Sequence, residues 1–210
     1  MLKFDERKIK LFSTIGQRAT FGLVALDLVK ILDNLIILTS DVSTSAGLDR
    51  FRKMYPENYY DVGIAEQNLI GVATGLASEG FKTVTTTFAP FQTTRCCEQI
   101  KVNLGYMQQK VILVGLASGI SLGNLGFTHC CIEDFGILRS IPNITIISPA
   151  DSLEVAKTFE AALYHNQSCY IRLTGTSNNP IIYKKDYKYE IGKSIQIKNG
   201  NDLTIFSNGS

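Results

Sequence analysis

The sequence predicts an α/β fold in which a mostly parallel sheet carries helices on both faces. Three observations support this fold class. Short runs of apolar residues are typical of strands that are buried on both sides, and the run 83–87 is rich in β-branched residues. Segments with helical periodicity alternate with these runs, which favours parallel pairing. The expected strands cover 35–38, 59–62, 83–87, 111–114, 144–147 and 170–173.

Apolar residues at helical spacing predict the helices between these strands. In the helix expected over 14–32, they are Phe21, Val24, Ala25, Leu28 and Leu32. Asp151, followed three residues later by Glu154, is typical of a capped helix start. Further helices are expected over 48–54, 65–79, 92–103 and 133–139.

The composition is that of one ordinary globular domain. The chain has 210 residues, 45% of them hydrophobic, and a formal net charge of +2. This near-neutral balance gives no electrostatic footprint for nucleic acid or for a membrane surface. No signal-peptide pattern is found at the N-terminus, and Asp27, Lys30 and Asp33 interrupt the most apolar run. Five cysteines without metal-ligand spacing predict reduced thiols and a cytoplasmic location.

The segment 61–68 organises the expected site. A strand ends near Val62 and a helix begins near Ala65, so Glu66 falls in the first turn of that helix. Ligands of open α/β sheets bind at the C-terminal edge of the strands, where this turn lies. The helix dipole favours an ionised acid here, whereas burial disfavours the ionised form.

The string Gly-Ile-Ala-Glu-Gln-Asn at 63–68 resembles the motif of the pyrimidine-binding domain of transketolase-like enzymes, which depend on thiamine diphosphate. The similarity runs from about Thr14 to about Leu173 and is nearest to the separately encoded C-terminal section of two-subunit transketolases. It implies that Glu66 hydrogen-bonds the cofactor's aminopyrimidine and favours the imino tautomer, which then removes the proton from the acidic thiazolium carbon. This role needs a carboxyl group that is protonated near neutral pH and shielded from water.

The same resemblance implies further contacts. Phe88 and Phe91 match the aromatic residues that hold the aminopyrimidine, because two rings can sandwich a flat heterocycle. His129 matches a histidine that lines the substrate channel and contacts the sugar's oxygens. Thr94 stands where one-chain transketolases usually have a third aromatic residue, a change that the split relatives tolerate.

Three more residues are assigned through the resemblance. Asp41 and Ser45 match a loop that faces the thiazolium ring and the substrate, so Asp41 is assigned to the cofactor and Ser45 to the substrate. Arg18 matches an arginine that binds the acceptor's phosphate, and a guanidinium suits phosphate because it can donate two parallel hydrogen bonds.

The sequence also departs from the family pattern. Ala117 replaces a channel histidine, Gly175 replaces a second phosphate-binding arginine, and 124–125 reads Asn-Leu in place of Glu-Asp. Each lost charged contact would remove about 1.5–3 kcal/mol of binding free energy. The resulting hypothesis is an acceptor that is unphosphorylated or unusual, which a normal kinetic preference for ordinary sugar phosphates would contradict.

The sequence contains no recognisable motif for the diphosphate half of the cofactor, neither a P-loop nor G-x-G-x-x-G. The resemblance therefore implies a partner, the N-terminal-section subunit, that holds Mg²⁺ and the diphosphate, with the active site between the two chains. Small residues in the Glu66 helix predict a close partner helix from a second copy of the chain, and thus a homodimer within a heterotetramer. These are Gly71, Ala73, Gly75, Ala77 and Ser78.

The character of the sequence changes after Pro180. Residues 1–183 are assigned to the pyrimidine-binding domain and residues 184–210 to a linker with the first strand of a further domain. Within that linker, a hairpin is expected over 187–197 and a strand over 203–206.

The predicted function is that of a transketolase subunit, which moves a two-carbon ketol unit from a ketose to an aldose, with Glu66 and His129 as catalytic residues. The β subunit of a 2-oxo-acid dehydrogenase and a deoxyxylulose-phosphate-synthase-like protein share the fold and the glutamate. Products formed from ketose donors and from 2-oxo acids would separate these alternatives. A non-catalytic interaction domain is the third alternative, and Ala117 and the change at 124–125 favour it.

Overall fold

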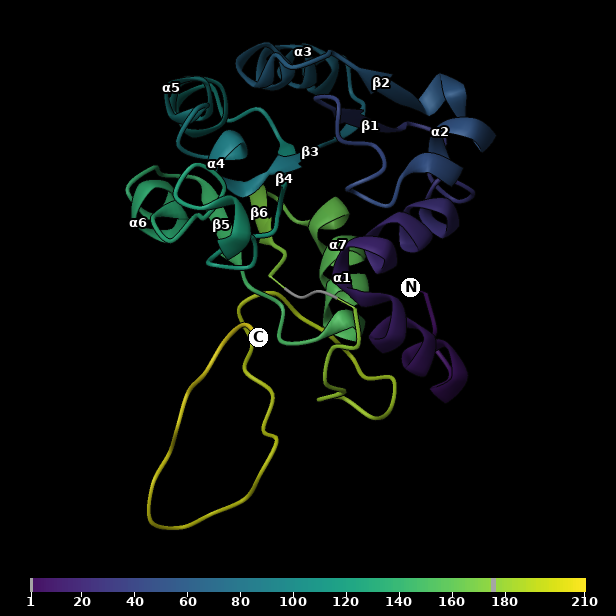
Figure 1. Cartoon of the computed structure of the whole chain (residues 1–210), viewed down its shortest axis with the longest axis vertical. Coiled ribbons are helices and arrows are strands. Elements are labelled where there is room, and N and C mark those ends of the chain that lie inside the picture. Colours follow the sequence, from purple (N-terminus) through teal and green to yellow (C-terminus); the bar gives the residue numbers. More distant parts are fainter. Residues whose placement is uncertain (1, 175–176) are drawn as a thin grey trace.

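Six parallel strands form the centre of the molecule (Figure 1). The structure is a computed structural model that describes residues 2–174 and 177–210. The strands lie in the order β2-β1-β3-β4-β6-β5, and each neighbouring pair is parallel. The expected fold class and the six expected strands are confirmed. The strands are β1 (Leu35–Thr39), β2 (Tyr59–Asp61), β3 (Lys82–Phe88), β4 (Val111–Leu116), β5 (Ile144–Ile147) and β6 (Ser168–Arg172).

Helices cover both faces of this sheet (Figure 1). On one face α1 (Glu6–Leu28) packs beside α7 (Ser152–Tyr164), and on the other lie α3 (Glu66–Ser78) and α6 (Asp134–Arg139). Among the helices that the structure describes, none is both long and apolar enough to span a bilayer. The shorter helical segments are α2 (Asp49–Met54), η1 (Pro56–Asn58), α4 (Ala89–Gln92), α5 (Cys97–Gln99), η2 (Ile100–Tyr106) and η3 (Gly123–Leu125).

Two apolar clusters fill the spaces between the sheet and its helices. Phe21 of α1 and Phe159 of α7 meet in the first, with their ring centroids 4.8 Å apart. Leu69 and Ile70 of α3 belong to the second, on the opposite face. Strands β1 and β4 are buried along their whole length, which explains why their sequences are continuous apolar runs without alternation.

Helix α1 begins earlier and ends earlier than the sequence predicts. The Asp5 side chain accepts a hydrogen bond from the backbone N–H of Lys8, so the helix starts at Glu6 and not at Thr14. The expected end at Leu32 is wrong by four residues. Gly16 interrupts the helix with φ 82° and ψ 176°, a conformation that only glycine adopts readily.

The single helix expected over 92–103 is wrong. In its place, α4 and α5 are separated by turns and followed by the π-helical segment η2. The backbone N–H of Arg95 bonds the carbonyl of Pro90, five residues back, at 3.1 Å. This wider spacing changes the direction in which the following side chains point, and such π-type turns are frequent at functional sites.

The expected hairpin over 187–197 and strand over 203–206 are also wrong. Residues 177–210 form loops without a described helix or strand, and part of them extends away from the sheet as the yellow segment in Figure 1. Leu203, Ile205 and Phe206 are 76%, 79% and 81% exposed. A strand requires a neighbour that pairs with its backbone, and these residues pair with no strand of the described sheet.

Candidate active site

Glu66 begins α3 at the C-terminal edge of the sheet, as its sequence position predicts. Strand β2 ends at Asp61, a turn passes through Gly63, and Ala65 directly precedes the helix. Gly63 has a φ of 72°, in the left-handed region that favours glycine. Glu66 is only 4% exposed, so its carboxyl group is shielded from water.

Asp61 connects the loop after β1 to the turn before α3. Its Oδ1 accepts hydrogen bonds from the backbone N–H groups of Asp41 (3.0 Å) and Gly63 (2.9 Å), and its Oδ2 accepts from the Thr39 hydroxyl at 2.8 Å. Burial alone would raise the pKa of Asp61, but these donors outweigh it, so the pKa lies below its ordinary value. The sequence prediction missed this residue, although an aspartate before Val-Gly at a strand end was a usable signal.

Three aromatic rings lie together where β3 ends and where the loop after β4 passes. They belong to Phe88, Phe91 and His129. The ring centroids of Phe88 and Phe91 are 6.2 Å apart, and His129 lies 5.8 Å from the first and 5.3 Å from the second. All three pairs meet edge to face, which suits the charge distribution of aromatic rings. The fold thus brings His129 together with two rings that lie about 40 residues earlier in the sequence.

Arg95 joins this cluster to Glu66. Its Nη1 lies 2.8 Å from Glu66 Oε1, and its Cζ lies 4.0 Å from the centre of the Phe91 ring. Sequence reasoning missed this residue. The helix expected over 92–103 does not form here, so helical spacing could not have indicated this contact.

Asp41 and Ser45 belong to the loop that follows β1, and Arg18 lies in α1 just after the break at Gly16. This loop packs tightly on α1: a Cβ at Gly22 would come within 2.0 Å of the Gly47 carbonyl oxygen. Asp41 is exposed, and Ser45 and Arg18 are partly exposed. The loop follows β1, which is the neighbour of β3, so it lies at the same sheet edge as the rings.

The family departures fall at this edge too. Ala117 directly follows β4, is 6% exposed and has a φ of 53°. Asn124 and Leu125 form the exposed turn η3. Gly175 lies outside the described residues. A small side chain at 117 thus lies where the resemblance predicts a channel histidine.

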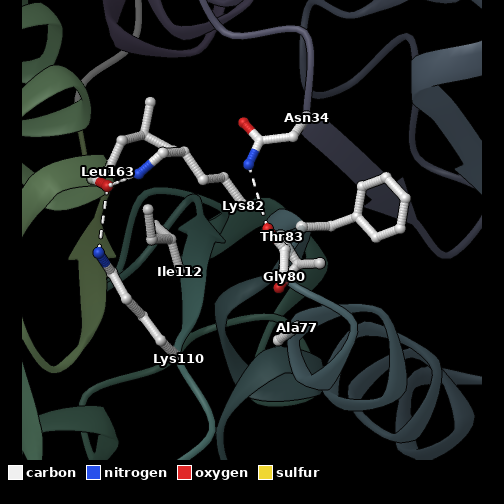
Figure 2. Close-up of a pocket in the computed structure, with 9 residues that line it drawn as sticks. Asn34, Ala77, Gly80, Lys82, Thr83, Lys110, Ile112 and Leu163 are labelled. Atoms are coloured by element: carbon white, nitrogen blue, oxygen red, sulfur yellow. Dashed lines mark hydrogen bonds between the residues drawn. The ribbon is translucent and has the colours of Figure 1, made fainter.

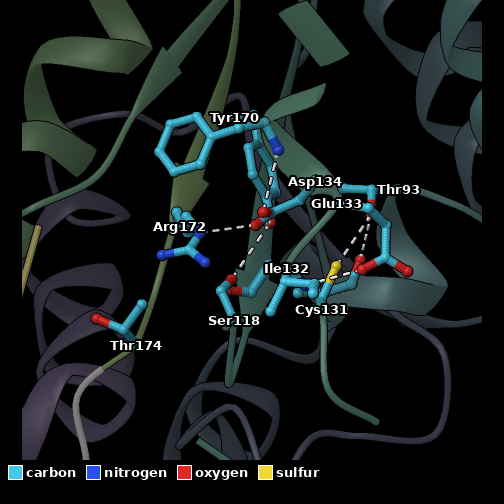
Figure 3. A network of polar contacts seen from close by, with 12 residues as sticks. Thr93, Ser118, Cys131, Ile132, Glu133, Asp134, Tyr170, Arg172 and Thr174 are labelled. Atoms are coloured by element: carbon cyan, nitrogen blue, oxygen red, sulfur yellow. Dashed lines mark hydrogen bonds and ion pairs between the residues drawn. The ribbon is translucent and has the colours of Figure 1, made fainter. Parts of the chain in front are cut away.

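A polar network supports the loop that carries His129 (Figure 3). The buried Asp134 accepts hydrogen bonds from the Tyr170 hydroxyl (2.9 Å) and from Arg172 Nε (2.7 Å). At the base of the loop, Gly119 and Cys131 exchange two backbone hydrogen bonds of 2.8 Å. These contacts fix both ends of the loop, so His129 has a defined place beside the two phenylalanines.

A small cavity of about 220 Å³ lies far from these residues (Figure 2). Lys82 and Lys110, at the starts of β3 and β4, both donate to the carbonyl oxygen of Leu163, at 2.7 and 3.1 Å. The cavity therefore opens at the N-terminal edge of the sheet, where its lysines bond the last turn of α7. It is separate from the Glu66 site.

The site residues fit one end of a flat, hydrogen-bonding heterocycle. The Arg95 guanidinium is itself planar and contacts both a buried carboxyl group and an aromatic face. For a metal ion the donor set differs: among residues 2–174 and 177–210 no three His, Cys, Asp or Glu side chains are grouped to hold one.

Residues 13–179 match the family model described as "Transketolase, pyrimidine binding domain". The chain belongs to this family. Its parallel sheet, with Glu66 at the first turn of α3, is accordingly the fold of a transketolase pyrimidine-binding domain.

Two curated relatives of this transketolase domain are named as subunits of transketolases. An apulose-4-phosphate transketolase subunit of Phocaeicola vulgatus is 32% identical over 196 residues, which is 93% of this chain and 62% of that protein. The 6-deoxy-6-sulfo-D-fructose transketolase subunit SqwH of Clostridium sp. is 34% identical over 177 residues, or 84% of this chain and 55% of that protein. The chain thus spans about three fifths of the length of such relatives.

Solved structures agree on the transketolase fold. A split-gene transketolase, described as an inactive β4 tetramer, matches with a TM-score of 0.78 and 31% identity. The matched region is 89% of this chain and 60% of that chain. The transketolase of Campylobacter jejuni has a TM-score of 0.70 over 78% of this chain and 26% of its own. At 22% identity this second likeness bears on the fold alone.

Proposed function

We propose that this chain is the pyrimidine-binding subunit of a two-chain transketolase, which transfers a two-carbon ketol unit from a ketose to an aldose. The observation that carries the proposal is the carboxyl group of Glu66, which is buried at the C-terminal sheet edge and linked through Arg95 to the face of Phe91. A buried acid beside an aromatic face is what the cofactor's aminopyrimidine requires.

In this proposal Glu66, Phe88, Phe91 and Asp41 hold the pyrimidine end of thiamine diphosphate. When bound, the cofactor supplies an acidic thiazolium carbon that acts as the nucleophile toward the donor's carbonyl group. The carboxyl group of Glu66 would exchange a hydrogen bond and a proton with the aminopyrimidine, which is general acid–base chemistry. The contact with Arg95 is one that a carboxylate makes, so Glu66 has to leave it before taking this role.

His129 lies beside the two phenylalanines. In this proposal it binds sugar oxygens through its ring nitrogens. In the structure its Nδ1 lies 3.0 Å from the Thr128 hydroxyl. That contact leaves the other ring nitrogen for the substrate. Ser45 and Arg18 would bind more distant parts of the substrate. Arg18 would be an anion contact, but it does not replace the two phosphate-binding side chains that are lost at Ala117 and Gly175. The acceptor is therefore expected to be unphosphorylated or unusual.

A second polypeptide completes the proposed site. Mg²⁺ and the diphosphate would lie on this N-terminal-section subunit. The loop that carries His129 exposes four large apolar side chains, which a contact with that subunit would cover. They are Ile120, Leu125, Phe127 and Ile132. The reduced state expected for the cysteines suits a reaction in the cytoplasm.

The test is to replace Glu66 in the complex reconstituted with the diphosphate-binding subunit. Glu66→Gln removes the proton-carrying group but keeps the shape, and the expected loss is about 100- to 10,000-fold in ketol transfer, the usual contribution of a positioned acid–base group. Glu79→Gln is the control, because Glu79 is exposed at the other end of α3. If Glu66→Gln and Glu66→Ala retain full activity, like the control, the chain is a non-catalytic interaction domain.

A further inference from the structure

The Arg95 side chain contacts two of the residues of the proposed pyrimidine site, Glu66 and Phe91. Its guanidinium binds Glu66 with an Nη1–Oε1 distance of 2.8 Å and lies on the ring of Phe91, with Cζ 4.0 Å from the ring centre. Its backbone is fixed at the same time. The Arg95 N–H donates to Pro90 O, and the side chain of Gln67 donates to Arg95 O, both at 3.1 Å.

A guanidinium and an aminopyrimidine resemble each other in shape and bonding. Both are flat and delocalised, both stack on an aromatic face, and both offer N–H donors at their edge. A ligand that stacks on this face of Phe91 and bonds Glu66 therefore needs the space that the guanidinium occupies. The two cannot be present together.

We propose that Arg95 is a place-holder, which fills the pyrimidine position of the unliganded chain and is displaced when the cofactor binds. This inference rests on the proposed function, because it takes the aminopyrimidine as the ligand of Glu66 and Phe91. It makes Arg95 a residue that sets cofactor affinity without itself contacting the reacting atoms.

The difference in exposure between the two partners favours displacement of the arginine. The Arg95 side chain is 43% exposed, whereas that of Glu66 is 5% exposed. The guanidinium can therefore move into water, where its charge is well solvated. Glu66 stays buried, and an unpaired buried carboxylate is costly, whereas a neutral carboxyl group can donate a hydrogen bond. Displacement of Arg95 thus leaves the Glu66 carboxyl group free to bond the ligand that replaces the guanidinium.

The test is calorimetric binding of thiamine diphosphate with Mg²⁺ to the reconstituted two-chain complex. Arg95→Ala removes the competitor, and the dissociation constant should fall about 5- to 30-fold, the factor expected for one partly exposed ion pair and one cation–π contact. Arg95→Lys keeps the charge but not the flat shape and should lie between the two. Arg139→Ala is the control, since Arg139 is an exposed arginine of α6.

The outcomes separate this inference from the function on which it rests. If the native complex binds the cofactor and Arg95→Ala binds it equally or less tightly, Arg95 is not a competitor and the place-holder idea is overturned. The proposed function falls, and the inference with it, if thiamine diphosphate binds neither the native complex nor the Arg95→Ala complex, although the Arg95 variants melt like the native protein.

A second measurement does not depend on catalysis. Protons of an arginine that lies on a phenylalanine ring are shifted upfield in an NMR spectrum by the ring current. In the chain without cofactor the Arg95 side chain should show this shift, which Phe91→Leu should abolish. Cofactor addition to the complex should also abolish it, and a shift that persists in the loaded complex would overturn displacement.

Discussion

Asp134 is fully buried, and its carboxylate accepts hydrogen bonds from three donors. Arg172 Nε and the Tyr170 hydroxyl donate to the same oxygen, and the backbone N–H of Phe135 donates to the other at 3.0 Å. Burial, followed by the charge of Asp134, raises the pKa of Tyr170 well above its ordinary value, so that hydroxyl stays a donor. The ion pair of Asp134 and Arg172 holds the start of α6 to the end of β6, beside the loop that carries His129.

Asp134→Ala should destabilise the protein by about 3–5 kcal/mol, because it leaves the Arg172 charge without its partner in a nearly buried place. Urea unfolding followed by circular dichroism measures this. Asp202→Ala is the control, since Asp202 is an exposed aspartate far along the chain from Asp134. Equal unfolding midpoints for the two variants would show that the buried pair contributes nothing to stability.

At the scale of elements, the start of α7 is held by one side chain that serves two segments. Asp151 Oδ1 accepts from the backbone N–H of Glu154 at 2.8 Å, as the capping pattern predicts. Its Oδ2 accepts from the N–H groups of Ile182 (2.9 Å) and Tyr183 (3.0 Å). The cap of the helix is therefore also the anchor of the segment that follows Pro180.

Asp151→Ala should cost about 1–2 kcal/mol of stability, the usual cost of a lost helix cap, and should free the segment after Pro180. Amide hydrogen exchange should become faster at Ile182 and Tyr183 and stay unchanged at the centre of the sheet. Asp33→Ala, an exposed aspartate in a turn, is the control. Unchanged exchange at Ile182 and Tyr183 would mean that their N–H groups are protected by something other than Asp151.

At the scale of the whole molecule, α3 exposes the small residues Gly71, Gly75 and Ser78. Ala73, which the sequence prediction also counted toward a partner helix, is instead buried in this chain's own core. A Cβ at Gly71 or Gly75 would meet no described atom within 4 Å, so neither glycine is required by packing inside this chain. Glycine in a helix interior is unfavourable by up to about 1 kcal/mol relative to alanine. We infer that this face packs on α3 of a second copy, in the proposed homodimer.

Gly71→Ala should raise the free energy of unfolding of the isolated chain by up to about 1 kcal/mol and weaken its self-association, because the methyl group would separate the two helices. Sedimentation velocity over a range of concentrations measures the second effect. Gly136→Ala is a close control: Gly136 also lies in a helix with no described atom near its Cβ position. A dimer of undiminished stability in Gly71→Ala would place the interface elsewhere.

The sequence by itself determined the parallel sheet, the capped start of α7 and the position of Glu66 at the first turn of α3. These features depend on local signals: apolar runs, side chains that cap their own helix, and a motif of neighbouring residues. The resemblance also named Phe88, Phe91 and His129, and the structure brings these three rings together because β3 and β4 are neighbours in the sheet. Their roles at the cofactor and the substrate stay predictions.

Only the tertiary structure decided which groups meet Glu66, Asp61 and Asp134. Arg95 reaches Glu66 because a π-type turn replaces the expected helix, and no spacing rule reports such a turn. Residues 203–206 have the composition of a strand but remain unpaired, since a strand depends on a neighbour that sequence pattern does not supply. Local propensity fixes what a segment can form, whereas burial and the available hydrogen-bond partners fix what it does form.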